Sequence, residues 1–289
     1  FKTTKPIYAL NYMLRTANDS EGRDPKKFKL YAALDSAPST DGSTAGWTLI
    51  DSEEDASSTI STNRKTMTEF SVDAPEVYQY FLFKVDETRD NNNEGKFQLS
   101  EIVMNNEYEV ISSDADMSAF AEKVNAGDIF LNAVLAADVN SSTSIGTESN
   151  MFTGTIEGLG HKVNLSIDAN AYGQGFIGVA KGVATVKNLI LTGSVRNTNS
   201  KTGGFIAEAR EGGVITIANC GNEANITGAG GETAAIVANN WGYRCILNIS
   251  NVYNIGDVVG TGDVASICAC QGNGSSAFTN VYNAGSITG

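Results

Sequence analysis

The second half of this sequence repeats itself at intervals of about thirty residues, and this repeat constrains the fold more than any other feature. Four similar segments, GFIGVA, GFIAEA, AIVANN and SICACQ, begin at residues 175, 204, 235 and 266. Their apolar residues Phe176, Phe205, Ile236 and Ile267 are 29, 31 and 31 residues apart. A period of roughly 20 to 50 residues is typical of solenoids and propellers, so it must be settled before any local motif is interpreted.

A second register follows the first one. The segments ANCGNEANITG, NVYNIGDVVG and NVYNAGSITG end on Gly228, Gly260 and Gly289. Each unit predicts two or three short strands that are too small to bury their own apolar side, whereas stacked units build one continuous core. The repeat therefore predicts a parallel β-helix, in which glycine and asparagine recur because the corners need positive φ.

The repeat also explains a stretch that resembles a phosphate-binding loop. TGGFIAEAREGG (202–213) has paired glycines at both ends. A P-loop requires a lysine and a helix after its last glycine, but VITIA follows here, which has the pattern of a strand. We therefore do not expect a nucleotide site, and no cofactor is predicted.

Composition changes near residue 110, which indicates two domains, 1–109 and 110–289. All four prolines precede residue 76, whereas only four of the 30 glycines precede residue 110. The first domain has short β-like segments separated by turn-forming residues, which predicts an antiparallel sandwich. These segments are 27–34, 47–51, 68–72, 78–86 and 97–105. The segment 78–86 is apolar on both faces, as expected of a central strand.

One helix is expected between the two β regions, within residues 112–128. Ser113 or Asp114 can cap its start and Gly127 can end it. Its apolar face carries Met117, Phe120, Ala121 and Val124. Its place before the repeats suggests that it caps the β-helix.

The repeats resemble a known family. GGFIAEAREGGVITIANCGNEANITG (203–228), together with NVYNIGDVVG and NVYNAGSITG, resembles the GLUG-type repeat of bacterial secreted and surface proteins. MFTGTIEGLGHKVNLSI (151–167) resembles the coil that precedes such repeats. The resemblance implies a right-handed parallel β-helix over 110–289 with a short N-terminal capping helix. Because the last repeat would leave an open coil edge, we also expect more repeats or another domain beyond residue 289.

The first domain resembles another family. LRTANDSEGRDPKKFKLYAALDS (14–36), GWTLIDS (46–52), YQYFLFKVD (78–86) and FQLSEIVM (97–104) resemble the galactose-binding-like jelly roll of the discoidin, or coagulation-factor C-type, group. The resemblance implies an all-β jelly roll that binds carbohydrate. It also implies that N-terminal strands of the jelly roll precede residue 1.

The turn NDSEGRDP (18–25) is the first candidate for ligand contact. Asn18, Asp19, Arg23 and Asp24 carry groups that can hydrogen-bond sugar hydroxyls. The same residues can instead close the turn, through an arginine–carboxylate pair and bonds to backbone N–H groups. Both interpretations remain open from the sequence.

Aromatic residues offer a second candidate surface. Trp241 and Tyr243 lie in NNWGYRC, which interrupts the repeat, and we expect them to be exposed and able to contact a glycan. Trp47 can stack on a sugar ring or pack its strand against the core. Amphipathic aromatic rings suit either environment.

A catalytic constellation is not predicted. The single histidine, His161, has no triad partners in its surroundings along the chain. The best acidic pair is Glu232 and Asp263, which are 31 residues apart and can stack in adjacent coils. Solvated turn residues are the alternative for this pair.

Metal binding is not predicted either. The cysteines are Cys220, Cys245, Cys268 and Cys270, and they lack Cys-x-x-Cys or Cys/His zinc spacing. Disulfides are conceivable for them, but free, semi-buried thiols are the expected state.

Charge and hydropathy limit the partners. The chain has 33 acidic and 20 basic residues, a net charge of −13, which disfavours nucleic acid and anionic membranes. No apolar run approaches the roughly 20 residues of a membrane-spanning helix, so no membrane insertion is expected. We expect a non-enzymatic adhesion or glycan-binding protein, secreted or on the bacterial surface. In this expectation the jelly roll contacts the sugar, and the β-helix serves as a scaffold or recognition surface. Its partners would be glycans or glycoconjugates, with surface proteins of a host or neighbouring cell as further candidates.

Two other functions remain open. One is a polysaccharide-degrading β-helix enzyme with an appended binding module, which would require a carboxylate cluster in a groove. The other is a non-catalytic spacer region of a larger surface peptidase.

Overall fold

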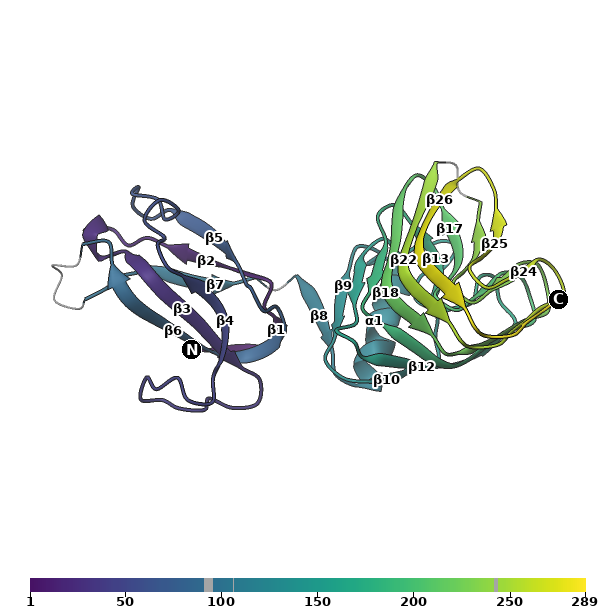
Figure 1. Cartoon of the computed structure of the whole chain (residues 1–289), viewed down its shortest axis with the longest axis horizontal. Helices are drawn as coiled ribbons and strands as arrows, with labels where there is room; N and C mark the ends of the chain where they lie inside the picture. The colour runs from purple at the N-terminus through teal and green to yellow at the C-terminus, as the bar shows by residue number, and fades with distance from the viewer. Residues whose placement is uncertain (91–95, 106, 242–243) are drawn as a thin grey trace. The chain divides into compact units, whose positions relative to one another are not determined.

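The computed structural model describes residues 1–90, 96–105, 107–241 and 244–289. The chain forms two compact units, Phe1–Tyr108 and Glu109–Gly289 (Figure 1). Most described residues outside turns are in β-strands. Within these ranges, no helix has the length and apolar character needed to span a bilayer.

The first unit contains two antiparallel sheets, with strand orders β1-β6-β3-β4 and β5-β2-β7. Its strands are β1 (Lys2–Tyr8), β2 (Asn11–Arg15), β3 (Pro25–Ala33), β4 (Thr48–Glu53), β5 (Met67–Ser71), β6 (Val77–Thr88) and β7 (Glu101–Met104). The five strands expected from the sequence are present, and β6 lies inside its sheet as expected. The strands β1 and β2 were not expected.

Both sheets contribute to one hydrophobic core. Tyr12 and Leu14 of β2 lie in the same buried cluster as Phe28 and Leu30 of β3 and Phe81 of β6. Buried and half-buried residues alternate along most of β3, so one face of that strand lies in the core. The first unit therefore has its own core, as a domain requires.

The second unit is a parallel β-solenoid preceded by α1 (Asp114–Ala126). Its early strands are β8 (Tyr108–Ile111), β9 (Asn132–Leu135), β10 (Val139–Ser141), β11 (Thr155–Glu157), β12 (Lys162–Ala169), β13 (Ile177–Lys181), β14 (Thr185–Lys187) and β15 (Ile190–Asn197). Its later strands are β16 (Thr202–Gly203), β17 (Ile206–Arg210), β18 (Gly213–Asn222), β19 (Asn225–Gly228), β20 (Thr233–Ala234), β21 (Val237–Asn240), β22 (Cys245–Asn254), β23 (Val258–Val259), β24 (Val264–Ala265), β25 (Cys268–Gln271), β26 (Ser275–Asn283) and β27 (Ile287–Thr288).

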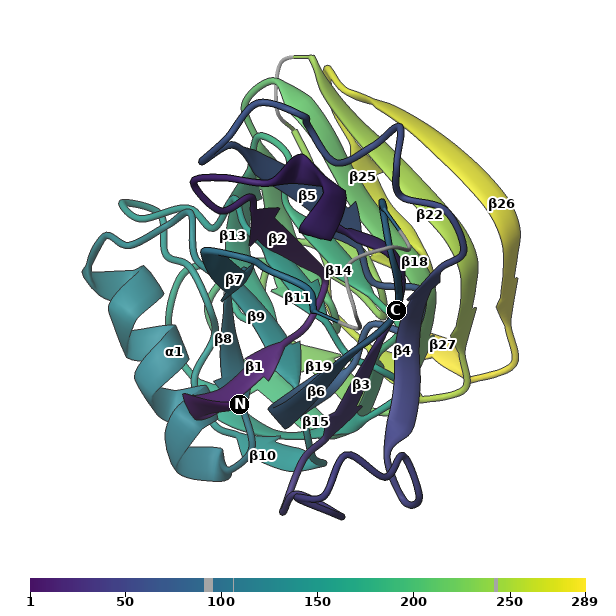
Figure 2. The same ribbon diagram turned by 90° about the vertical axis from the view of Figure 1, so that its left-hand side faces the viewer.

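The coils stack in the register that the repeats predict. β13, β17, β21 and β25 form one parallel sheet that aligns Ile177, Ile206, Val237 and Cys268. The residues before them form the expected apolar ladder, in which Phe176, Phe205 and Ile236 are fully buried. On another side of the solenoid, β18, β22 and β26 are neighbouring parallel strands of one sheet, each from a successive coil (Figure 2). The predicted parallel solenoid is therefore confirmed.

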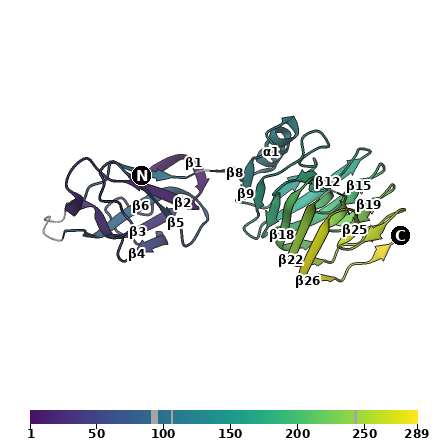
Figure 3. The same ribbon diagram turned by 90° about the horizontal axis from the view of Figure 1, so that it is seen from above.

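α1 lies at the end of the solenoid where β9 and β10 begin (Figure 3). The Ser113 hydroxyl accepts a hydrogen bond from the Asp116 backbone N–H, and Gly127 ends the helix with a φ of 127°. All four residues of the predicted apolar face are buried, and the ring of Phe120 packs edge-on against Phe152 of the first coils. The helix thereby extends the core of the solenoid.

Asparagine provides the positive φ of one corner. Asn188, Asn219, Asn251 and Asn280 have φ values of 54°, 55°, 54° and 51° at equivalent positions in consecutive coils. Their side chains form a ladder in which each amide Nδ2 donates to the Oδ1 of the preceding coil, at 3.1, 2.9 and 3.0 Å. The Asn188 amide continues the ladder to the Glu157 carboxylate at 2.9 Å.

Glycine serves a different purpose at several corners. Gly213 has the expected positive φ, 140°, but Gly204 does not. A Cβ on Gly204 would lie 2.0 Å from the carbonyl oxygen of Ala235 in the next coil. A Cβ on Gly256 would likewise lie 2.0 Å from the carbonyl oxygen of Ala224. These glycines are required because the backbones of adjacent coils approach closely, and the expectation of positive φ was wrong for them.

A second asparagine ladder lies inside the solenoid. Asn222 and Asn254 are fully buried. The Asn222 Nδ2 donates to Asn254 Oδ1 at 2.8 Å, and Asn254 Nδ2 donates to Asn283 Oδ1 at 2.6 Å. Asn254 Nδ2 also donates to the carbonyl oxygen of Gly256 at 2.9 Å. The ladder holds the coils in register because each amide donates hydrogen bonds both within its own turn and to the next coil.

We expect the substitution Asn254→Ala to lower the free energy of unfolding by about 2 to 3 kcal/mol, because it removes hydrogen bonds among fully buried groups. Urea unfolding followed by circular dichroism measures this loss. Thr227→Ala on the exposed side of β19 is the control and should change the free energy by less than about 0.5 kcal/mol. Equal stabilities of the two variants would contradict the structural role of the buried ladder.

Candidate functional site

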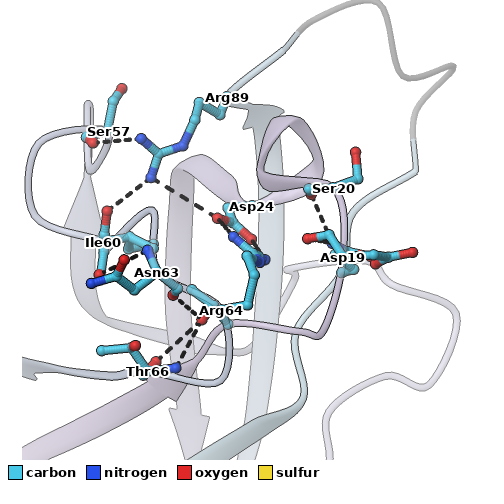
Figure 4. Close-up of polar contacts among 12 residues, drawn as sticks. Asp19, Ser20, Asp24, Ser57, Ile60, Asn63, Arg64, Thr66 and Arg89 are labelled. Carbon is cyan, nitrogen blue, oxygen red and sulfur yellow. Dashed lines mark hydrogen bonds and ion pairs between the residues drawn. The ribbon is translucent and has the colours of Figure 1, made fainter.

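The turn at residues 18–25 is built around a buried ion pair (Figure 4). Asp24 is fully buried, and the Arg64 guanidinium donates to both of its carboxylate oxygens, at 2.7 Å each. The Arg89 guanidinium lies 4.0 Å from the same carboxylate and donates to the carbonyl oxygens of Ser57 and Ile60. Asp24 thus joins three segments of the first unit.

The geometry at Asp24 fits the structural interpretation of this turn. Its partners come from residues 64 and 89, whereas the sequence suggested that a nearby arginine such as Arg23 closes the turn. Both oxygens of Asp24 are bonded and shielded from solvent, so they do not face a ligand. Asn18 and Asp19 are exposed and Arg23 is half-buried. For these three residues, contact with a ligand stays a prediction.

Trp47 and His161 each contact one neighbouring polar side chain. Trp47 is half-buried and lies outside the core, and its indole N–H donates to the hydroxyl of Ser39 at 3.3 Å. His161 does have a carboxylate partner that the sequence did not indicate, because its Nδ1 lies 3.1 Å from Asp138. The Asp138 carboxylate also accepts from the Lys162 backbone N–H, and these bonds hold the pKa of Asp138 below its usual value. They tie two coils together at a turn.

Glu232 and Asp263 lie at equivalent positions of adjacent coils, with a basic residue in the same column. Lys201, Glu232 and Asp263 directly precede the paired strands β16, β20 and β24. Glu232 accepts a hydrogen bond from the Asn239 amide at 2.7 Å. Among the described residues, no group of three or more His, Cys, Asp or Glu side chains is placed to hold a metal ion.

All four cysteines are free thiols in the structure, as expected. Cys220 and Cys245 are buried, and burial raises the pKa of Cys220 to about 12. Burial likewise raises the pKa of Cys268 to about 11. These protonated thiols are poor nucleophiles at neutral pH.

A polar cluster that the sequence did not reveal surrounds Glu208, the middle residue of β17. Glu208 is 2% exposed and accepts hydrogen bonds or ion pairs from three side chains. Lys201 Nζ lies 2.7 Å from its Oε1, while Arg210 Nε and the Tyr172 hydroxyl lie 2.7 and 2.8 Å from its Oε2. We call these four residues the Glu208 cluster.

Tyr172 connects the two cations of the Glu208 cluster. Its hydroxyl accepts hydrogen bonds from Lys201 Nζ and from Arg210, the latter at 2.6 Å. Its ring also lies beneath both charges, with Lys201 Nζ 4.6 Å and the Arg210 guanidinium carbon 5.2 Å from the ring centre. Arg210 reaches further to Glu148 at 3.0 Å. The cluster is therefore fixed by charge and by cation–π contact.

The hydrogen bonds of the cluster determine its protonation. Burial by itself lowers the pKa of Lys201, but the hydrogen bonds to Glu208 and Tyr172 outweigh it and raise that pKa above the ordinary value. The pKa of Arg210 is raised in the same way, with Glu148 and Glu208 outweighing burial. Both side chains are cations at neutral pH, and they neutralise the buried carboxylate.

Trp241 stands beside the Glu208 cluster and is 58% exposed. It directly follows β21, at the position equivalent to Arg210, which is the last residue of β17 one coil earlier. Gly272 in the next coil leaves space for the indole, since a Cβ there would lie 2.8 Å from Trp241 Cε3. The predicted exposure of Trp241 is confirmed, while Tyr243 lies outside the described residues.

Trp241 and the Glu208 cluster line one pocket of about 450 Å³. Its lining residues are Tyr172, Lys201, Glu208, Arg210, Glu211, Trp241 and Asn273. Four coils contribute to this lining, although the residues are scattered over a hundred positions of the sequence. The volume is within the range of small-ligand sites, roughly 300 to 1,000 Å³.

Comparisons with known proteins leave the function open. No family model matches the sequence, and no curated protein matches it significantly. One of the solved structures that match is a putative immunoglobulin A1 protease from Bacteroides ovatus, with 15% identity and a TM-score of 0.37. That match covers 60% of this chain and 74% of the other chain. No functional argument is drawn from a match at this level.

We expect Asp24→Asn to destabilise the first unit by about 3 to 5 kcal/mol, because it leaves the guanidinium groups of Arg64 and Arg89 without a neutralising charge. Thermal unfolding followed by calorimetry measures the effect. Asp19→Asn in the same turn is exposed and should leave the transition within about 2 °C of the original. A transition of Asp24→Asn that matches that of Asp19→Asn would contradict the buried ion pair.

Proposed function

We propose that this chain is a non-enzymatic glycan-binding protein and that its sugar contact lies on the solenoid, at the Trp241 pocket. The observation that carries the proposal is the exposed Trp241 indole at the rim of a pocket whose charged wall is already paired. An exposed aromatic ring beside fixed hydrogen-bonding groups is suited to a ligand that has both apolar and hydroxyl-bearing faces. A pyranose ring has this character.

The charge of the pocket favours an uncharged sugar. The lining carries two cations, Lys201 and Arg210, and two carboxylates, Glu208 and Glu211, so its net formal charge is zero. Arg210 is also paired with Glu148 outside the lining. A phosphate, sulfate or uronate would have to compete with Glu208 for both cations. Neutral hydroxyl groups can instead bond to the rim of the cluster without breaking its ion pairs.

The rigidity of the cluster supports binding. All four of its side chains are held by mutual hydrogen bonds and by cation–π contact before any ligand arrives. Because these groups are already ordered, a ligand does not have to immobilise them when it binds.

The same cluster is the one observation that favours the enzyme alternative. A carboxylate, a phenol and two cations in one pocket could support sugar-chain cleavage. Against this, both carboxylate oxygens of Glu208 are bonded, to three partners in all, and Lys201 remains protonated at neutral pH. A protonated Lys201 cannot act as a general base, and Glu208 is held by three donors, so we favour binding over catalysis.

The first unit is proposed to be a galactose-binding-like jelly roll that assists this recognition. Its two antiparallel sheets around one core are compatible with that fold. The solenoid is proposed to be a right-handed β-helix of GLUG-type repeats, on a secreted or bacterial surface protein. The spacer role in a larger surface peptidase remains the alternative in which neither unit binds a glycan.

We expect Trp241→Ala to weaken binding of its glycan by about thirtyfold, since loss of a central aromatic contact costs about 2 kcal/mol. The ligand is first found on a glycan array of neutral and acidic oligosaccharides probed with the whole chain, and affinities follow by calorimetry. Trp47→Ala is the matched control because it removes the other tryptophan, in the first unit. Loss of binding in Trp47→Ala with full binding in Trp241→Ala would move the site to the first unit.

The enzyme alternative has a separate test. We expect no release of reducing or unsaturated sugar ends when the whole chain is incubated with the polysaccharide corresponding to its array ligand. If ends are released and Tyr172→Phe or Glu208→Gln abolishes that release, the chain is an enzyme and the non-enzymatic proposal is wrong. Binding of the same polysaccharide by these variants shows that the pocket is intact.

A further inference from the structure

A second pocket lies on the solenoid along the exposed asparagine ladder. It has a volume of about 560 Å³. Its lining residues are Leu159, Gly160, Asn188, Ile190, Asn219, Cys220, Gly221, Asn251 and Tyr253. It shares no residue with the Trp241 pocket. We call it the asparagine trough.

Tyr253 closes the trough with a fixed aromatic ring. Ile190, Gly221, Tyr253 and Tyr282 occupy equivalent positions in consecutive coils. The Tyr253 ring lies directly over Gly221, since a Cβ there would be 2.2 Å from Tyr253 Cζ. Tyr282 stacks on Tyr253 with ring centres 5.8 Å apart, and the Tyr253 hydroxyl donates to Glu223 at 2.9 Å. Glycine at 221 leaves the space that this ring occupies.

Asparagine amides form the polar side of the trough. The ladder uses one N–H and one lone pair of Asn219, which donates to Asn188 and accepts from Asn251. A primary amide has two N–H donors and two lone pairs, so each ladder residue keeps one of each for another partner. Coils are about 4.8 Å apart, which places a donor and an acceptor at every coil along the trough.

The lining has no charged side chain, and its remaining surface is apolar, from Leu159, Ile190 and Cys220. A charged ligand would find no counter-charge here. A purely apolar ligand would displace water from the row of amides and offer them no hydrogen bonds in return. The ligand that matches both sides has an apolar face and a ring of hydroxyl groups.

We propose that the asparagine trough is a second carbohydrate site, which binds an uncharged pyranose segment of an oligosaccharide. The sugar C–H face packs on the apolar lining and on Tyr253, while its hydroxyls bond to the amides of Asn188, Asn219 and Asn251. The site is independent of the Trp241 pocket, so either can fail without the other.

The substitution Asn219→Gly tests the trough, because glycine keeps the φ of 55° without strain and removes the amide. Asn280→Gly is the matched control: Asn280 has a φ of 51° and the same ladder bond but does not line the trough. Both variants are made in the Trp241→Ala chain. Neutral hexasaccharides of glucose, xylose, mannose and galactose are titrated by calorimetry.

We expect the Trp241→Ala chain to bind at least one of these hexasaccharides. Asn219→Gly should then weaken binding about tenfold, the effect of one lost hydrogen bond, while Asn280→Gly stays within about twofold. The side-chain amide NMR signals of Asn219 and Asn251 should shift on titration. The proposal is overturned if no hexasaccharide binds to the Trp241→Ala chain, or if the two glycine variants bind equally. A chain in which Trp241→Ala has no effect but Asn219→Gly abolishes binding would refute the Trp241 site and support the trough.

Discussion

The stacking of parallel strands in register is the constraint on which the second unit depends. Each position in a coil meets the equivalent position of the next coil at about 4.8 Å, so neighbouring coils must present compatible groups at every position. Apolar residues satisfy this inside, as at Phe176, Phe205 and Ile236. Asparagine satisfies it where polar groups must be buried, because an amide can donate to one coil and accept from another, as Asn254 does. Glycine satisfies it where backbones approach too closely for a Cβ.

The candidate sites lie where equivalent positions of consecutive coils carry different types of residue. Glu208 shares its column with Val179, Asn239 and Cys270, and its buried charge is stable because Lys201 and Arg210 reach it from neighbouring positions. Likewise, Tyr253 follows Gly221 in its column, and the Tyr253 ring occupies the space above the glycine and forms one wall of the asparagine trough. The regular coils thus supply rigid positions, and the irregular residues supply chemistry that a ligand can recognise.

The sequence predicted the features that recur or that are local. The apolar ladder is visible in the sequence because its residues recur about every thirty positions. The limits of α1 are visible because Ser113 and Gly127 cap the first and last turns of the helix, which are next to them in the sequence. The sites were harder to predict because their contacts are distant and occur once. Asp24 meets Arg64 across 40 residues, and Tyr172 meets Glu208 across 36. Trp241 was recognised as exposed, but its neighbours belong to other coils and follow only from the register.

The central claim is that sugar recognition resides on the solenoid at Trp241. The chain has two tryptophans, so its ¹⁵N–¹H spectrum contains two indole N–H signals, from Trp47 in the first unit and Trp241 in the second. A titration of the whole chain with its array ligand measures both at once. The account predicts that the Trp241 signal shifts in a saturable manner while the Trp47 signal stays in place. A saturable shift of Trp47 with an unchanged Trp241 signal would contradict it.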